Sequence, residues 1–401
     1  MWEQIRSNQI RSAILVAGMG VLLLLVGYFL GLYFFDSGIG GMIIALIVWA
    51  VMNLVAFFQG DNILLALSRA RKIGYDDHPR LYNVVEEMKI ASGLEKMPDI
   101  YIIDDPALNA FATGRDPNRA AVAITSGLLQ KLNRDELQGV IGHEMAHIKN
   151  RDVLLMAISG VLLGSIVILA WYGTRFLFLS GRARGRRGSS AGGLAQLIIL
   201  AVGIVLMILA PIMAQLIYFA ISRRREYLAD ASSALYTRYP EGLASALEKL
   251  AASTSQLRSA NQATAPMYII NPFRKKGMSA SDLTSTHPPI SERIRILRSM
   301  AGGASFADYD RAYLRVRRTD RGILPPSAKA VAGAVGLRAA GVEVTPLEAD
   351  KIERARETSD LMWRLSNYKA ITCDCGVKLR VPPKFKEPEI RCPHCGRINT
   401  V

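Results

Sequence analysis

The sequence predicts an α-helical membrane protein with four transmembrane helices, an inserted α+β domain and a small cysteine-rich module at its C-terminal end. Three observations lead to this fold class. Four apolar runs are each long enough to cross a bilayer. Mixed helical and strand-like patterns fill the stretch between the second run and the third. All four cysteines lie within the last thirty residues of a chain that is half hydrophobic, more than is usual for a soluble protein.

The four apolar runs are predicted to be membrane spans. They cover residues 13–35, 39–58, 153–179 and 194–221, and each reaches or exceeds the roughly 20 residues that a spanning helix needs. A signal peptide would begin as the first run does. This run is longer than a usual signal core, however, and a second span follows it at once. The last two runs could form a buried hairpin in a soluble domain, but their length favours the membrane.

The net charge of +15 indicates either nucleic acid or an anionic membrane surface as a partner. We expect the lipid bilayer and no nucleic acid, because no nucleic-acid-binding module is visible and many arginines flank apolar runs. Basic residues on the N-terminal side of the membrane outnumber those near the third-to-fourth loop by eight to five, which places the larger group in the cytoplasm. The arginine-rich composition of that loop weakens this inference. The two groups are Arg6, Arg11, Arg69, Arg71, Lys72 and Arg223–Arg225, against Arg175, Arg182, Arg184, Arg186 and Arg187.

The region between the second and third spans is predicted to be an α+β unit. His78-Pro79 opens a helical stretch over residues 81–91, where His78 is expected at the surface or as a helix cap. Two strand-like runs follow, residues 100–103 and 120–125, and the segment Asn109-Ala-Phe-Ala-Thr-Gly lies between them.

The strongest chemical signal is a His-Glu-x-x-His motif in an amphipathic helix that begins at Asn133, three residues before Glu136, in the pattern of a capping box. His143 and His147 are four residues apart, so they share one helix face and can bind one zinc ion. Glu144 could then act as general base on a water that zinc has made acidic. The alternative is a pair of solvated or core histidines without a metal.

A third ligand can come from the helix after the fourth span, where Glu226 and Asp230 again lie four residues apart. Sites with two histidines on one helix often take a glutamate, and Asp230 could accept the far N–H of a ligating histidine. The alternative is a solvated helix face with Glu226 paired to the preceding arginines. Two membrane crossings separate His147 from Glu226, so both lie on the same side, within roughly 10 Å of the membrane surface.

The cysteines form two pairs, Cys373-x-Cys375 and Cys392-x-x-Cys395, which is the pattern of a four-thiolate structural zinc site in a zinc ribbon. The first pair has one intervening residue instead of two, so free or disulfide-paired cysteines remain the alternative. His394 is not expected to be a ligand. The ribbon could dock a substrate or partner, or it could serve stability alone.

Taken together, these motifs resemble the HtpX-type integral membrane zinc metallopeptidases, relatives of the CAAX prenyl endopeptidases. The resemblance covers about residues 10–300. The matching features are Asn109-Ala-Phe-Ala-Thr-Gly, Gly142-His-Glu-Met-Ala-His, Arg151-Asp152, Glu226-Tyr-Leu-Ala-Asp230 and Thr286-His-Pro-Pro289 with Arg293-Ile294.

The resemblance implies a gluzincin-like metalloprotease domain with zinc ligands His143, His147 and Glu226, and with Glu144 as the base. It also implies that Asn109, Ala110, Phe111 and Ala112 line the cleft as an edge strand along which a substrate backbone lies. His287 is either a catalytic donor to the oxyanion or a helix-start residue that shapes the cleft.

The predicted function is that of a membrane-embedded zinc metalloendopeptidase of a prokaryotic inner membrane, with its catalytic domain in the cytoplasm. Its substrates would be membrane or misfolded proteins, and its cofactors one catalytic zinc and one structural zinc. The alternative is a non-proteolytic scaffold that recruits partners through its ribbon, although such a scaffold would not need Glu144. The predicted units are spans one and two (1–60), the first catalytic half (61–152), spans three and four (153–221), the second catalytic half (222–320), a linker with a charged helix (321–370) and the ribbon (371–401).

Overall fold

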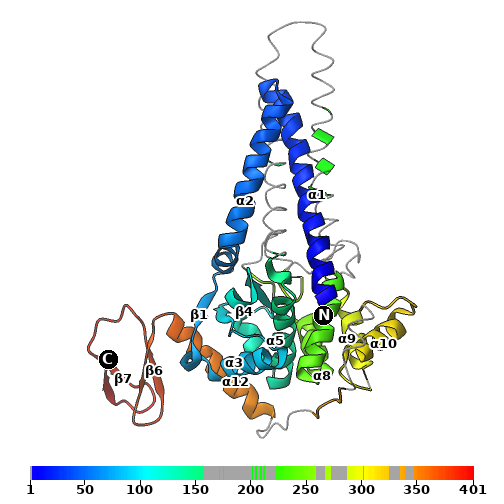
Figure 1. Cartoon of the computed structure of the whole chain (residues 1–401). Helices are drawn as coiled ribbons and strands as arrows, with labels where there is room; N and C mark the ends of the chain where they lie inside the picture. The colour runs from blue at the N-terminus through cyan, green and yellow to red at the C-terminus, as the bar shows by residue number, and fades with distance from the viewer. Residues whose placement is uncertain are drawn as a thin grey trace.

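In the computed structural model, a long helical hairpin stands on a compact mixed domain, and a small β module lies at one side of that domain (Figure 1). The structure describes residues 2–154, 223–258, 267–271, 287–300, 302–324, 335–339 and 347–401, with a few isolated residues between 155 and 222. The predicted third and fourth spans and the arginine-rich loop therefore lie almost entirely outside the described residues.

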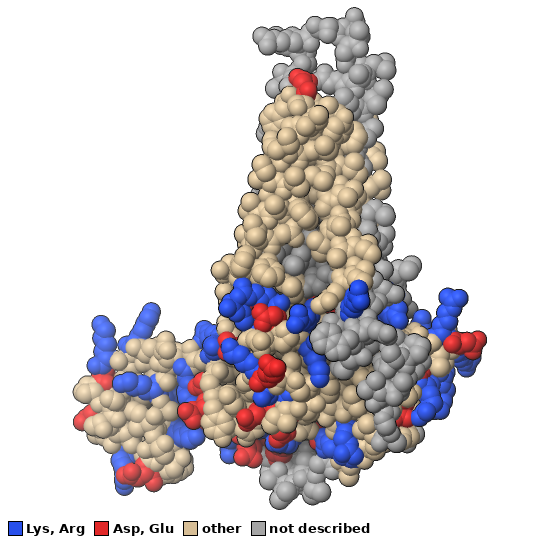
Figure 2. All heavy atoms as spheres, in the orientation of Figure 1, with Lys and Arg blue, Asp and Glu red and all other residues tan. Residues whose placement is uncertain are grey.

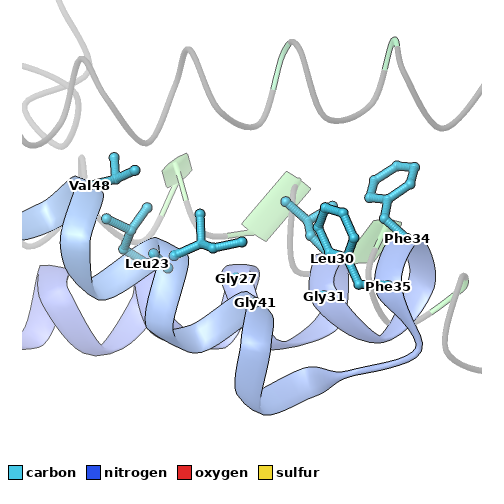
Figure 3. A pocket seen from close by; sticks show the side chains of 10 residues that line it. Leu23, Gly27, Leu30, Gly31, Phe34, Phe35, Gly41 and Val48 are labelled. Atoms are coloured by element: carbon cyan, nitrogen blue, oxygen red, sulfur yellow. The ribbon is translucent and has the colours of Figure 1, made fainter.

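The hairpin consists of α1 (Trp2–Phe35) and α2 (Gly38–Leu67), joined at a turn where the Ser37 side chain caps α2. The two helices touch through glycines, because a Cβ added at Gly41 would lie 2.1 Å from the Gly27 carbonyl oxygen and 2.5 Å from Gly31 Cα. Small residues in such positions allow close packing of membrane helices. Figure 3 shows the apolar groove beside this contact, lined in part by Leu23 and Leu30.

The hairpin agrees with the first two predicted spans in position. Among the described residues, one stretch, Gly38–Val55 of α2, is long and apolar enough to cross a membrane, and α1 contributes a shorter apolar stretch over Val16–Leu32. Large apolar side chains point outward along α2, with Ile39 66% and Ile47 57% exposed. Such exposure suits a lipid environment rather than water.

The domain is built on a four-stranded sheet in the order β1-β2-β4-β3. Its strands are β1 (Arg71–Ile73), β2 (Asp99–Ile103), β3 (Ala110–Gly114) and β4 (Ala120–Thr125). Strand β2 is parallel to β4, whereas β1 and β3 are antiparallel to their neighbours. The two predicted strand runs match β2 and β4, and the Asn109 segment supplies β3 at one edge of the sheet.

Helices pack around this sheet to complete the core. They include α3 (Pro79–Ser92), α4 (Ser126–Lys131), α5 (Arg134–Lys149), α8 (Pro240–Ala252), α9 (Ile290–Arg298) and α10 (Phe306–Arg317), together with a helix whose described part is 223–237. Two short 3₁₀ turns, η1 (Tyr75–Asp77) and η2 (Pro117–Arg119), precede α3 and β4. The capping box predicted at Asn133 and Glu136 is confirmed, and His78 caps α3 by accepting the Leu81 N–H.

Helix α5, which carries the His-Glu-x-x-His motif, contacts α3, α8 and β3. Gly139 permits the contact with α8, because a Cβ at this position would lie 2.6 Å from the backbone nitrogen of Leu243. On another face of α5, Ser233 of the 223–237 helix donates a hydrogen bond to the Gly139 carbonyl. The motif helix is thus fixed on several faces by elements far apart in the sequence.

The described residues between 335 and 365 pack against the domain. Helix α12 (Leu347–Leu365), within the predicted charged helix, lies against α4, with Thr358 and Leu361 fully buried. The predicted linker 328–344 is described only at 335–339. There, Arg338 pairs with Asp135 and donates to the Thr237 carbonyl. This piece of the linker is therefore bound to the domain.

The small β module contains two hairpins, β5 (Lys369–Thr372) with β6 (Lys378–Val381) and β7 (Glu389–Arg391) with β8 (Ile398–Thr400). Lys378 and Arg380 of β6 both pair with Asp360 of α12, and the Arg380 guanidinium lies over the Trp363 ring. These contacts attach the module to α12.

Candidate active site

Three side chains from two distant segments converge at the centre of the domain. His143 and His147 extend from α5, and Glu226 extends from the helix that follows the predicted fourth span. The two Nε2 atoms are 3.2 Å apart, His143 Nε2 is 3.5 Å from Glu226 Oε2, and His147 Nε2 is 3.4 Å from Glu226 Oε1. The structure thus brings together the three residues that the sequence proposes as ligands.

This donor set fits a zinc ion. Ligand atoms about 2.0–2.1 Å from a tetrahedral zinc are about 3.3–3.4 Å from one another, close to the three separations observed. Glu226 Oε2 is buried without a hydrogen-bond partner among the described residues, so an acceptor remains for a cation. Two imidazoles and one carboxylate are also the ligand types of catalytic zinc sites that leave a fourth position open.

Each histidine is held by a buried carboxylate on its far nitrogen. His143 Nδ1 is 3.0 Å from Asp230 Oδ1, the contact expected for Asp230. His147 Nδ1 is 3.2 Å from Asp152 Oδ2. These partners hold the Nδ1–H tautomer and direct each Nε2 towards the metal position.

Asp152 belongs to one of the motifs that carry the family resemblance, but the sequence alone indicates no role for it. It follows the end of α5, where Arg151 adopts a left-handed conformation with φ of 57°. This turn brings the carboxylate back to His147, five residues earlier. The signal available in the sequence was an acidic residue placed just after the helix that carries the ligands.

Glu144 is the carboxylate next to the metal position on α5. Its side chain is 1% exposed and faces the backbone N–H of Ala112 in β3, and it has no side-chain hydrogen-bond partner among the described residues. Burial raises the pKa of Glu144, and the two neighbouring imidazoles oppose that shift. A carboxyl group with a raised pKa is suited to accept and return a proton near neutral pH.

The surroundings carry an excess of negative charge. The carboxylates of Glu144, Asp152, Glu226 and Asp230 are all buried around the two imidazoles, and the Arg293 guanidinium pairs with Asp230 and lies 3.5 Å from Glu226 Oε2. Buried charges of one sign require compensation, and a divalent cation would supply it. The local charge therefore also fits a metal ion.

The imidazoles show the effect of these carboxylates on their pKa values. Burial lowers the pKa of His147, but hydrogen bonds to Asp152 and Glu226 outweigh it and raise the pKa to about 10. Burial also acts against the charge of Glu226, yet His287 and the two ligand histidines hold its pKa well below the usual range. The two imidazoles thus occupy a field that stabilises positive charge.

His287 lies at the rim of the same cluster, with Nε2 3.8 Å from Glu226 Oε2. Burial lowers its pKa to about 4, so the ring is neutral at physiological pH, and its single N–H has the Tyr268 backbone as its partner. Both roles considered for His287, donor to an oxyanion and residue that shapes the cleft, are compatible with this position.

The Asn109–Ala112 segment runs past the cluster at the edge of the sheet. Asn109 is 2% exposed, and its Nδ2 donates to the Ile270 carbonyl at 3.1 Å. Just after β3, the Arg115 guanidinium lies over the rings of Phe57 and Phe58 in α2. The edge strand thus leads from the metal cluster to the base of the hairpin.

The cluster is closed to solvent in this structure. His143, Glu144, His147, Glu226 and His287 are each less than 5% exposed.

The cysteine module brings its four thiols together, as the sequence predicts. Cys373 Sγ is 3.6 Å from Cys395 Sγ, and Cys375 Sγ is 3.7 Å from Cys392 Sγ. Thiolates about 2.3 Å from a tetrahedral zinc are about 3.8 Å from one another. All four Sγ atoms lie within 4.8 Å of one another, so they fit a second, structural zinc.

Several known proteins are similar to this chain. A family model described as peptidase family M48 matches residues 76–301. A protease HtpX homolog of Dictyoglomus turgidum is 46% identical over 299 residues, which are 75% of this chain and 94% of that protein. A protease HtpX homolog of Streptococcus pneumoniae is 43% identical over 301 residues, 75% of this chain and 100% of that protein. The crystal structure of S. mikatae Ste24p aligns with a TM-score of 0.38 and 20% identity over 73% of this chain and 66% of that one.

Proposed function

Because the chain belongs to peptidase family M48, as its motifs indicate, we propose that it hydrolyses internal peptide bonds of membrane and misfolded proteins at the His143–His147–Glu226 cluster. It is a membrane zinc metalloprotease, and its substrates are peptides or proteins. The observation that carries the assignment is Glu144, a buried carboxylate beside three candidate metal ligands that has no ion-pair partner in the part of the chain that the structure describes. A metal that only stabilised the fold would not need such a group.

The residues of this site divide the reaction among them. When bound by His143, His147 and Glu226, zinc supplies Lewis acidity that polarises a peptide carbonyl and lowers the pKa of a water towards neutrality. Glu144 removes a proton from the attacking water as the water oxygen forms its bond to the carbonyl carbon of the peptide. It then delivers that proton to the departing amine as the C–N bond breaks. His287 is the donor to the oxyanion of the tetrahedral intermediate, once its ring N–H has been released from the Tyr268 backbone.

Substrate is bound as an added strand along the edge of β3 that does not pair with β4. The backbone of Asn109 is directed towards β4, because the Thr125 N–H donates to the Asn109 carbonyl. Backbone direction alternates along a strand, so Ala110, Ala112 and Gly114 direct their N–H and C=O groups away from β4. An extended peptide can pair with such groups whatever its side chains, which suits a protease with many substrates.

Substrates come from the membrane or from its cytoplasmic surface. Support comes from the contact of Arg115 with Phe57 and Phe58, directly below the apolar stretch of α2. In the face shown in Figure 2, the hairpin surface carries no Lys or Arg, whereas basic side chains gather where it meets the domain. Arg69, Arg71 and Lys72, all exposed, follow α2 at this level. A basic belt of this kind favours the cytoplasmic face of a prokaryotic inner membrane, with a four-span layout.

The C-terminal module is a zinc ribbon that holds one structural zinc through Cys373, Cys375, Cys392 and Cys395. The separations of the four sulfur atoms support this site. It is distinct from the catalytic cluster because its ligands all belong to the β5–β8 module.

The test is cleavage of an unfolded model protein by the full chain purified in detergent. Glu144→Gln should abolish cleavage and keep the catalytic metal, since it alters the base and leaves all three ligands in place. Glu86→Gln, the same change at an exposed position of α3, is the control and should retain activity. Equal cleavage by wild type and Glu144→Gln, or cleavage that survives a chelator, would contradict the protease assignment and leave the scaffold alternative.

A further inference from the structure

Arg293 of α9 is fully buried, and its guanidinium contacts several residues of the metal cluster. Its Nε and Nη2 atoms form a two-pronged pair with Asp230, at 2.8 Å to Oδ2 and 2.7 Å to Oδ1. Nη2 also lies 3.5 Å from His143 Nδ1, and Nη1 lies 3.5 Å from Glu226 Oε2. One guanidinium thus contacts two of the candidate metal ligands, Glu226 and His143, together with Asp230, the carboxylate that orients His143.

The pair with Asp230 has a direct consequence for His143. Asp230 accepts the Nδ1–H of His143 through the same Oδ1 that receives Arg293 Nη2. Two-pronged arginine–carboxylate pairs fix the plane of the carboxylate as well as its charge. Arg293 therefore determines where Asp230 can accept the hydrogen bond from His143 Nδ1–H, and Asp230 in turn sets the direction of His143 Nε2.

The fourth contact of Arg293 leads to the substrate edge. Nη1 donates to the Ile269 carbonyl at 3.0 Å, and the Ile269 N–H donates to the Ala110 carbonyl at 3.0 Å. Ile269 belongs to residues 267–270, which we call the cleft-end segment. This segment occupies the outward-facing carbonyl of Ala110. The Ala112 N–H faces Glu144, so the Ala112 carbonyl and the Gly114 backbone are the outward-facing groups that a substrate can pair with.

The cleft-end segment is anchored as part of the core. All its residues are less than 9% exposed. The Tyr268 ring packs edge-on against Phe111 with centroids 5.1 Å apart, and its hydroxyl is 3.3 Å from Ser68 Oγ. Asn109 holds the Ile270 carbonyl. The segment therefore holds a fixed position at the edge of β3, and the hydrogen bond from Arg293 to the Ile269 carbonyl links it to the metal cluster.

We propose that Arg293 is a positioning residue with two linked tasks: it orients His143 through Asp230, and it holds the cleft-end segment that sets where a substrate strand begins on β3. The second task rests on the proposed protease function. A substrate then pairs with the Ala112 carbonyl and the Gly114 backbone only, and its chain must leave the strand edge at Ala110. Neither task requires Arg293 to touch the substrate.

The first experiment measures metal affinity in the full chain by titration with Co²⁺, whose absorption distinguishes a histidine–carboxylate site from a thiolate site. Arg293→Gln should weaken the histidine–carboxylate site by about 10–100-fold and leave the thiolate site unchanged, as expected for the loss of a partner behind a ligand. Arg293→Lys should weaken it less, because it retains the charge and loses the fork. Arg298→Lys is the matched control, since Arg298 lies on the same helix and pairs with the exposed Glu241 and Glu248.

A folded Arg293→Gln protein with wild-type Co²⁺ affinity would overturn the first task. If that variant does not fold, Arg293→Lys and Asp230→Asn serve in its place. Because they interrupt the same contact, the affinity loss of the double variant Arg293→Lys/Asp230→Asn should fall short of the product of the two single losses. A loss equal to that product would count against the proposal.

The second experiment maps cleavage sites in an unfolded protein with metal-saturated enzyme. Arg293→Lys should shift or broaden the distribution of cleaved bonds, whereas Arg298→Lys should reproduce the wild-type pattern. An unchanged pattern in an active Arg293→Lys enzyme would overturn the second task. Absence of cleavage by the wild type would instead refute the proposed function and leave the metal titration as an independent test.

Discussion

The role of Asp152 can be tested by the smallest chemical change available, Asp152→Asn. The carboxylate is 1% exposed, and its Oδ2 lies 3.2 Å from His147 Nδ1. Asparagine keeps the shape and can still accept the N–H, but it has no charge. A hydrogen bond to a charged group contributes about 1.5–3 kcal/mol, and a neutral one about 0.5–1.5 kcal/mol. The difference, about 1–1.5 kcal/mol, corresponds to roughly a tenfold loss of metal affinity.

The assay is the Co²⁺ titration of the full chain, read at the absorption of the histidine–carboxylate site. Asp360→Asn makes the same change in an exposed pair with Lys378 and Arg380, far from the cluster, and should leave this affinity unaltered. Wild-type affinity in Asp152→Asn would refute the argument that the far-side carboxylate orients His147. An equal loss in Asp360→Asn would show that the assay reports general destabilisation.

Three further predictions concern the frame around the site. Burial lowers the pKa of His78 to about 4, so between pH 6.5 and pH 4 the unfolded chain binds a proton at this residue and the folded chain does not. The free energy of unfolding should therefore fall by about 3 kcal/mol from pH 6.5 to pH 4. His78→Asn, which retains a helix cap, should flatten this part of a profile of melting temperature against pH. Gly139→Ala should cost about 1–3 kcal/mol in thermal unfolding because its Cβ meets the α8 backbone, whereas Gly74→Ala, with nothing closer than 3.8 Å, should be nearly neutral. Removal of residues 371–401 should abolish the thiolate signal and leave the catalytic metal bound; loss of both metals on truncation would contradict two separate sites.

Local chemistry in the sequence was sufficient to predict several parts of this molecule. The positions of His143 and His147 on one face follow from the periodicity of a helix, and the cap at Asn133 follows from the residue three places later. The strands at 100–103 and 120–125 follow from short apolar runs. The pairing of four cysteines into one small module follows from their spacing. In each case the interacting residues are close in the chain, so the geometry of one element is enough.

The remaining features depend on contacts between distant segments. Spacing alone could suggest Glu226 as a ligand, but only the packing of its helix against α5 places it 3.4–3.5 Å from both imidazoles. Asp152 and Arg293 acquire their roles because a left-handed turn and a distant helix bring them behind the ligands. Residues 335–339 bind the domain through Arg338, and α12 binds it through a buried face. No local pattern in the sequence of a linker indicates either contact. Side-chain periodicity encodes which face of an element is apolar, whereas the partner of that face is determined by the packing of the whole chain.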